Sequence, residues 1–513
     1  MSQSSEISLI PSPTHPWTDL LDAMTNQKYR TAFELLEEIL DGTLLPDDEI
    51  RRELCKRALV SGDLILYRFV CKIIGGKYLF DPVYFEEAVK TDAHNLLGLL
   101  AQTYPDAMSL VVNPSTERSP PTHIAIQANS IKTFEIIFPF ATKETILRYS
   151  SDQISLLTEA TLCGSDCVVE LLTDLSYISD LIQVANTDPV QSFSVLHYAA
   201  LTCRYPTFKK LFDAFSAIGN TRNLPTQDCL TVLMIMICCD APKARLFIDY
   251  LINDLDPNHP LLTEPDAFGS TPLHSAAIMG SGEIVNALYT TYATKDLLLT
   301  RDAVHDFTFF DCLVHLNHAS IIKELLVRDD FDRRLLSIPE DPSSTPIDHA
   351  ILMEYSEIAE LMYPLSVETG VVAELCSQDI NVLQRAAYFD LKSLVQLITS
   401  DPNMCSTLMI GDDDDSHTPL HVAAYMSSAE VYALIYEYST VEQVRLQEKH
   451  WGLTALHLCV LYRDQGMIEL VLRDQAKARA MMEVRDVDGL TALDYARMRS
   501  LELATILEAA MSA

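Results

Sequence analysis

The sequence predicts an all-α solenoid of helix-turn-helix units, and three observations support this prediction. A short segment, Thr271–Ala277, returns at residues 418–424 and in part at residues 454–459. Helical patterns aligned on that segment recur about every 36 residues along nearly the whole chain. In addition, 48% of the residues are apolar and only 21% are charged, so each unit can bury a hydrophobic face. Stacked units that contact only their neighbours accommodate 513 residues without several separate globular domains.

The recurring segment contains the signals of a short helix. Thr271 supplies an N-cap oxygen, and Pro272 occupies the first helical position, where its missing N–H costs nothing. Two alanines after His274 allow a neighbouring helix to approach closely. Gly280, six residues after His274, ends this first helix, and an apolar stripe then predicts a second one.

We call the position of His274 the anchor of its unit. The last six anchors are separated by 36 or 37 residues each. Seven anchors match the segment by sequence, whereas the others depend on helical periodicity and a well-placed Ala, Leu or Gly. The predicted anchors are Asp22, Lys56, Glu86, His123, Thr158, His197, Met234, His274, Asp311, Asp348, Gln384, His421, His457 and Asp494.

The residues Thr271–Ala276 and Thr418–Ala423 match the T-P-L-H-x-A signature, and the chain resembles the ankyrin-repeat family. The resemblance implies about 12–14 repeats with short β-hairpin fingers. It also implies that each anchor His bonds the Thr that begins its helix and neighbouring backbone. The family period is about 33 residues, so the surplus is expected in loops. A tetratricopeptide array has a similar period, but its signature residues are absent.

The chain is expected to form one continuous array in three parts. Residues 1–16 are rich in Ser and Pro and are expected to be a disordered lead-in. Residues 17–190 are expected to hold diverged repeats, and residues 191–513 clearer repeats that include a C-terminal capping repeat. A slight break is expected near residues 220–227 or 364–374.

Catalytic and metal-binding patterns are not found in the sequence. It lacks the phosphate-binding, nucleophile-elbow and H-E-x-x-H motifs, so we expect no catalytic residues, no cofactor and no metal. The anchor histidines are expected to be structural. His417 and His421 are four residues apart, but Thr418 and Pro419 place the helix start between them, so they do not share one helical face.

The charge and the cysteines restrict the partner and the compartment. A net charge of −35 argues against nucleic acid as a partner. It leaves two alternatives, a protein partner with a basic surface or solubility alone. The twelve cysteines include no C-x-x-C pair, which favours a reducing, cytoplasmic or nuclear location. We expect no membrane insertion and a monomer.

The resemblance to ankyrin repeats also predicts where a partner binds. Partners of that family commonly dock on the concave face, at positions four and five residues after the anchor and on the finger. Large apolar and aromatic residues recur there, most densely between residues 380 and 465. The alternative is that these residues cover one another as additional core. The candidates are Phe268, Ile278, Met279, Tyr388, Phe389, Tyr425, Met426, His450, Trp451, Leu461 and Tyr462.

Four adjacent carboxylates, Asp412, Asp413, Asp414 and Asp415, are expected in the finger that precedes His421. Because like charges repel, they are expected to be solvated or paired with cations. Three alternatives remain: an exposed loop tip, a contact for Lys or Arg of a partner, and a cation site.

Together these features favour a non-catalytic adaptor or scaffold that binds another protein through its concave face. One alternative is a bacterial effector or targeting subunit that masks or redirects a host protein. Another is an enzyme whose unrecognised domain lies in residues 1–120.

Overall fold

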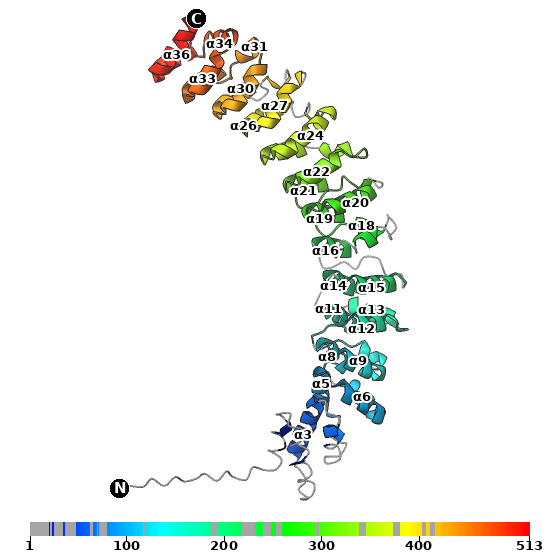
Figure 1. The fold of residues 1–513 in the computed structure, drawn as a ribbon. Helices are drawn as coiled ribbons and strands as arrows, with labels where there is room; N and C mark the ends of the chain where they lie inside the picture. Colours follow the sequence, from blue (N-terminus) through cyan, green and yellow to red (C-terminus); the bar gives the residue numbers. More distant parts are fainter. Residues whose placement is uncertain are drawn as a thin grey trace, which may run out of the picture. The chain divides into compact units, whose positions relative to one another are not determined.

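The protein, described by a computed structural model, is an all-α repeat solenoid of successive helix pairs (Figure 1). The lead-in expected at residues 1–16 lies outside the described part of the chain. The described residues are 20, 23–24, 34–35, 48–61, 65–68, 70, 80–115, 118–150, 152–186, 193–202, 204–217, 231–239, 248–252, 259–293, 297–337, 345–372, 380–402, 407–410 and 416–512.

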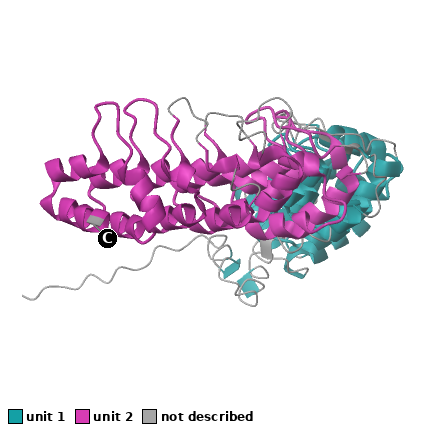
Figure 2. Cartoon of the chain, turned by 90° about the horizontal axis from the view of Figure 1, so that it is seen from above, with its two compact units in different colours: residues 1–255, 259–261 teal, residues 256–258, 262–513 magenta. Residues whose placement is uncertain are grey.

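The chain divides into two compact units. Unit 1 comprises residues 1–255 and 259–261, and unit 2 comprises residues 256–258 and 262–513. Figure 2 shows the two units in different colours, and in unit 2 the helices form two rows with connecting loops on one side.

The first helices of the repeats have the same bounds relative to their anchors. Nine of them begin two residues before the anchor and end four residues after it. The anchors predicted without a clear signature at Thr158, Met234, Asp311 and Gln384 are therefore confirmed. The first helices are α8 (Pro121–Gln127), α11 (Leu156–Leu162), α14 (Val195–Leu201), α16 (Val232–Cys238), α19 (Pro272–Ile278), α21 (Phe309–His315), α23 (Pro346–Leu352), α26 (Val382–Tyr388) and α29 (Pro419–Tyr425), with the slightly longer α32 (Ala455–Tyr462) and α35 (Ala492–Arg499).

The second helices vary in length, from seven to thirteen residues. They are α9 (Ile131–Ile137), α12 (Asp166–Thr173), α15 (Tyr205–Ala217), α20 (Gly282–Ala293), α22 (Ala319–Leu326), α24 (Ser356–Glu368), α27 (Lys392–Ser400), α30 (Ala429–Tyr438), α33 (Gln465–Leu472) and α36 (Leu501–Ser512). Further helices are α3 (Asp48–Ser61), α5 (Pro82–Lys90), α6 (His94–Thr103), α7 (Pro105–Val112), α10 (Lys143–Ile146), α13 (Ile178–Asn186), α18 (Pro260–Thr263), α31 (Val441–Val444), α34 (Gln475–Met482) and the 3-10 turns η2 (Phe138–Phe140) and η3 (Arg333–Leu336).

In nine repeats the corner between the two helices has the same backbone conformation, whereas Ser500, between α35 and α36, has a φ of −157°. The residue six positions after the anchor has a positive φ, and the next N–H donates to the carbonyl two positions after the anchor, as from Ser281 to Ala276 at 3.2 Å. This is the bonding pattern of a helix that ends in a left-handed residue. The corner residues are Asp92, Asn129, Gly164, Gly280, Asn317, Glu354, Asp390, Ser427 and Arg463.

The anchor side chain joins its own helix to the following repeat. At the start of α29, Oγ1 of the N-cap Thr418 lies 2.7 Å from Nδ1 of His421, and Nε2 of His421 lies 3.0 Å from the carbonyl oxygen of Leu453. His274 makes the same contacts with Thr271 and with the carbonyl of Phe307. The contacts expected of the anchor histidines are thus confirmed for these two.

A buried contact between a histidine ring and a carboxylate takes this place in part of unit 1. The N-cap of α8 is Pro120, which offers no side-chain partner. The ring of His123 instead contacts the Glu159 carboxylate of the next repeat, with Nδ1 2.9 Å from Oε2, and both side chains are buried. Gln127 donates to the other Glu159 oxygen at 2.7 Å, so the carboxylate is held by two groups.

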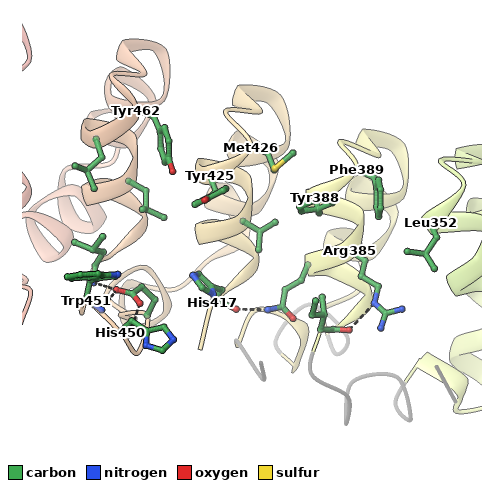
Figure 3. Close-up of a pocket in the computed structure, with 17 residues that line it drawn as sticks. Leu352, Arg385, Tyr388, Phe389, His417, Tyr425, Met426, His450, Trp451 and Tyr462 are labelled. Atoms are coloured by element: carbon green, nitrogen blue, oxygen red, sulfur yellow. Dashed lines mark hydrogen bonds between the residues drawn. The ribbon is translucent and has the colours of Figure 1, made fainter. Parts of the chain in front are cut away.

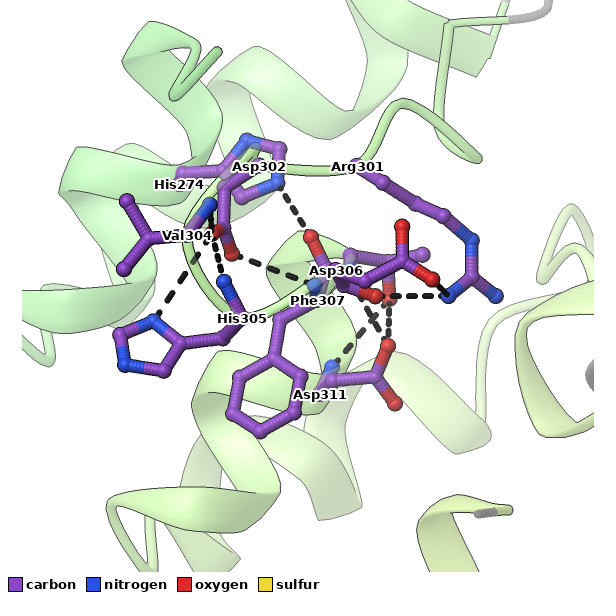
Figure 4. Close-up of polar contacts among 9 residues, drawn as sticks. His274, Arg301, Asp302, Val304, His305, Asp306, Phe307 and Asp311 are labelled. Carbon is purple, nitrogen blue, oxygen red and sulfur yellow. Dashed lines mark hydrogen bonds and ion pairs between the residues drawn. The ribbon is translucent and has the colours of Figure 1, made fainter. Parts of the chain in front are cut away.

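The fingers are hairpin loops, and none of the described residues forms a regular strand. Figure 4 shows one finger, in which the buried carboxylate of Asp302 accepts hydrogen bonds from the N–H groups of Val304, His305 and Phe307. Single backbone bonds connect adjacent fingers, as from Ala303 to the Phe268 carbonyl at 2.7 Å. Asp266, Glu448 and Asp486 accept hydrogen bonds from the backbone of their own fingers in the same way.

The corner residues allow a direct test of backbone strain. Glu354 has a φ of +60°, a region that costs a non-glycine residue roughly 1–2 kcal/mol. Replacing Glu354 by Gly is expected to raise the free energy of unfolding by about 0.5–1 kcal/mol in urea titrations. The matched change Glu357→Gly lies within α24 and is expected to lower it by a similar amount. Destabilisation by both changes would contradict the assigned corner.

The buried anchor histidines predict a loss of stability in acid. Burial lowers the pKa of His421 to about 4, from 6.5 in the unfolded chain. As the pH falls below 6.5 the unfolded chain therefore takes up the proton first, and about 2 kcal/mol is lost by pH 5. Because Gln384 fills the equivalent position in its own repeat, His421→Gln is expected to fold and to lose less stability between pH 7 and pH 5. Urea titrations at pH 7 and pH 5, followed by Trp451 fluorescence, measure this loss. The prediction is refuted if His421→Gln loses as much stability between the two pH values as the unaltered protein does.

Candidate functional site

Unit 2 contains a groove that encloses about 850 Å³. It runs over the first helices α23, α26, α29 and α32 and one finger, as Figure 3 shows. We call this surface the aromatic groove. Its lining residues are Leu352, Ile380, Gln384, Arg385, Tyr388, Phe389, His417, Val422, Tyr425, Met426, Glu448, His450, Trp451, Leu453, Leu458, Leu461 and Tyr462.

Two aromatic pairs form the walls of the aromatic groove. Tyr388 and Phe389 meet edge to face with ring centroids 5.0 Å apart, and Tyr425 meets Tyr462 of the next repeat at 5.4 Å. Burial, and then a hydrogen bond with Tyr425, raises the pKa of Tyr462. The three tyrosines nevertheless remain 52%, 58% and 47% exposed. They are therefore surface residues that touch one another and are still accessible to a partner.

Trp451 closes the finger side of the groove and is 65% exposed. The finger is shaped by Glu448, whose buried carboxylate accepts hydrogen bonds from the N–H groups of His450 and Trp451 at 2.7 Å and of Leu453 at 3.0 Å. The indole therefore lies on a loop whose backbone is fixed by hydrogen bonds to the Glu448 carboxylate. This arrangement reduces the ordering cost of binding at this position.

One ion pair lies at the end of the groove nearest α23. The Arg385 guanidinium lies 2.9 Å from Asp348 Oδ1, and it also donates to the Ile380 carbonyl. Burial raises the pKa of Asp348 to about 6, although Arg385 opposes that rise. Asp348 lies in α23 and Arg385 lies in α26, so this ion pair connects two consecutive repeats along the groove.

The structure brings together most of the predicted site residues. Eight of them line the aromatic groove: Tyr388, Phe389, Tyr425, Met426, His450, Trp451, Leu461 and Tyr462. Phe268 and Ile278 line a separate hollow of about 340 Å³, and Met279 is exposed outside it. The candidates Asp412, Asp413, Asp414 and Asp415 lie outside the described residues.

The sequence prediction missed several exposed apolar residues in the same register, of which Leu352 lines the aromatic groove and Leu316 lines the smaller hollow. Leu316, Leu352 and Met353 are exposed and occupy the positions four or five residues after the anchors Asp311 and Asp348. Applying the same register to those two repeats would have found them. With them, every repeat of unit 2 from α19 to α32 has exposed apolar residues at these positions.

The smaller hollow adjoins a pair of histidines. His315 Nδ1 lies 2.9 Å from His349 Nε2, and the ring of Phe307 contacts both. Burial, and then the neighbouring His315, lowers the pKa of His349. The short contact is suited to a hydrogen bond in which one ring nitrogen donates its N–H and the other accepts. Within the described ranges, no group of three or more His, Cys, Asp or Glu side chains is placed to hold a metal ion.

No helix in the described part of the chain combines the length and apolar character that crossing a bilayer requires.

Comparisons with known proteins add little to this geometry. No protein-family model matches the chain, and no curated protein matches it. Among solved structures, the chain is similar to the ankyrin repeat domain of Bcl-3, described as a member of the IkappaB protein family. The identity is 16%, over 61% of this chain and 97% of the Bcl-3 chain, and the TM-score is 0.23. The helix bounds and corners of the chain itself therefore remain the basis of the fold assignment.

The exposure of the groove tyrosines predicts how stability responds to their removal. Tyr425→Ala/Tyr462→Ala is expected to lower the free energy of unfolding by no more than about 1 kcal/mol, because both rings are half exposed. Tyr432→Ala in α30 is the matched control, because its ring is fully buried, and a loss of about 3–5 kcal/mol is expected. Chemical unfolding measures both, and equal losses would place the groove rings in the core.

Proposed function

We propose that the protein is an ankyrin-repeat adaptor or scaffold without catalytic function, and that its partner protein binds in the aromatic groove. The observation that carries the proposal is the groove itself: exposed rings from three consecutive first helices and one finger surround a single hollow. Hydrophobic and aromatic side chains clustered in this way are characteristic of binding hot spots. In this proposal the site belongs to the clearer repeats of residues 191–513.

The charge of the chain supports a partner with a basic surface. The net charge is −35, and opposite charges increase the rate of encounter and disfavour acidic competitors. The apolar rings then supply affinity after encounter, since each anchor that leaves water contributes through its buried area. The rigid stack of repeats requires little reorganisation on binding.

A photocrosslinking experiment tests the site. Tyr425 is replaced by the photoreactive residue benzoylphenylalanine in the full chain, which is then irradiated in a eukaryotic lysate. The matched control has the same residue in place of Tyr438, an exposed tyrosine at the end of the second helix α30. Adducts specific to position 425 are expected, and Tyr388→Ala/Tyr462→Ala is expected to reduce them at least about tenfold because hot-spot anchors are lost.

The same set of adducts from positions 425 and 438 would contradict the proposed site. So would adducts at position 425 that persist unchanged when the two neighbouring rings are removed.

A further inference from the structure

We infer that the junction between α21 and α23 is an acid-sensitive hinge inside unit 2, closed while His315 and His349 share a hydrogen bond and opened when both rings are protonated. The inference does not depend on the proposed partner. Its evidence is the contact between the two rings, the chemistry of the anchor at this junction, and the place of the junction between the aromatic groove and the smaller hollow.

The contact between the two histidines crosses the junction. His315 is the last residue of α21 and His349 lies in α23, and Nδ1 of His315 is 2.9 Å from Nε2 of His349. A hydrogen bond between these atoms needs one nitrogen with a proton and one without. When both rings are protonated, neither nitrogen accepts, and two positive charges meet at the same place. The second proton therefore turns an attraction into a repulsion.

The anchor of α21 supports this junction less than an imidazole does. Nε2 of His274 and of His421 lies 3.1 Å and 3.0 Å from a carbonyl oxygen of the following finger. Asp311 instead accepts hydrogen bonds from the N–H and the hydroxyl of Thr308, and when ionised it has no proton for a carbonyl. The histidine contact therefore contributes more at this junction than an added hydrogen bond would contribute at a junction closed by an imidazole.

Two neighbouring junctions have different residues at the same positions. His315 lies four residues after its anchor, and His349 lies one residue after the next anchor. The equivalent residues are Tyr388 and Val422 between α26 and α29, and Tyr425 and Leu458 between α29 and α32. Neither of these pairs titrates near neutral pH. The α21–α23 junction therefore has an acid response that this position does not give to the other two.

Other ionisable groups surround the histidine pair. They are His274 in α19, Arg301, Asp302, His305 and Asp306 in the finger before α21 (Figure 4), Asp311 and Cys312 in α21, His318 before α22, Asp348 in α23, Glu354 and Tyr355 after α23, and Arg385 in α26. Arg301 pairs with Asp306, Arg385 pairs with Asp348, and the Asp302 carboxylate accepts hydrogen bonds from its own finger.

The direction of the pKa shifts separates the histidine pair from the buried carboxyl groups. Burial, and then His315, lowers the pKa of His349 from 6.5, so the opened junction takes up the proton more readily and stability is lost as the pH falls. Burial raises the pKa of Asp311, and it raises the pKa of Asp348 to about 6. These two carboxyl groups bind protons more readily in the folded chain, so they favour the closed junction in acid. They therefore oppose the effect of the histidines.

The junction lies between two apolar surfaces. The residues that line the smaller hollow belong to α19, α21 and the loops next to them, whereas those of the aromatic groove belong to α23 and later elements. His315 lines the smaller hollow, and Leu352, in the same helix as His349, lines the groove. Opening the junction therefore separates the two surfaces, and a partner that contacts both is held less tightly in acid.

Hydrogen exchange of the full chain, followed by mass spectrometry, tests the hinge. After correction for the intrinsic pH dependence of exchange, protection in α21 and α23 is expected to fall at least about fivefold between pH 7 and pH 5, the factor that one lost hydrogen bond contributes. In His315→Asn/His349→Gln the amide nitrogens replace Nδ1 and Nε2, and an amide pair does not titrate, so this variant is expected to keep its protection. His305→Gln is the matched control, because His305 also contacts Phe307 but lies outside the pair, and it is expected to behave as the unaltered protein.

A titration of the histidine ring signals by NMR is the second measurement, and it needs no folded double variant. His349 is expected to gain its proton below pH 6.5, at the pH where protection in α21 and α23 is lost, and His349→Gln identifies its signal. Three results would each overturn the inference: no loss of protection in the unaltered protein, an equal loss in the double variant, or a His349 that titrates at or above pH 6.5. None of them bears on the adaptor proposal, which is tested by the crosslinks at position 425.

Discussion

The whole stack depends on the side chain at the third position of each first helix. In the His274 and His421 repeats this single buried ring contacts the N-cap of its own helix and the backbone of the next finger. Gln384 does the same with its amide, which donates to the carbonyl of His417. Because an unpaired buried polar group costs about 1–3 kcal/mol, the register between neighbouring repeats is fixed at these points. Packing then follows: the residue two positions later is a fully buried Ala in most repeats, which allows close approach of the helices.

That register is also what creates the aromatic groove. Nine of the first helices end four residues after the anchor, and α32 and α35 end five residues after it, so the side chains of the last turn project from nearly the same place in these repeats. Tyr388 and Tyr425 lie four residues after their anchors and Tyr462 lies five residues after His457. Each is the last residue of its helix, and all three are exposed. The site therefore needs no special loop for its walls. Only its finger side depends on local geometry, through the bonds of Glu448 to its own backbone.

Much of this could be predicted from the sequence, because the determinants are local and repeat with a constant spacing. The anchors at Thr158 and Gln384 followed from helical periodicity and a well-placed Ala, Leu or Gly, although neither residue is a histidine. The exposure of the groove rings did not follow, because a stripe at helical spacing is equally compatible with a buried core. Contacts between repeats that lack the Thr–His arrangement at the helix start could not be predicted from the sequence either. The pairing of His123 with Glu159 depends on a proline at the N-cap and on a carboxylate 36 residues later.

Because the anchor residues differ in chemistry, the junctions between neighbouring repeats differ in how readily they separate. A carboxylate anchor such as Asp311 bonds its own Thr308 but has no proton to offer the following finger when it is ionised. Asp348 has the same limitation, and there an arginine from the next repeat supplies the missing donor. Junctions in a linear array differ in strength according to such details, and opening begins at the weakest. Under tension, the seam that follows Asp311 would therefore part before the seams closed by an imidazole or by the Asp348–Arg385 bridge.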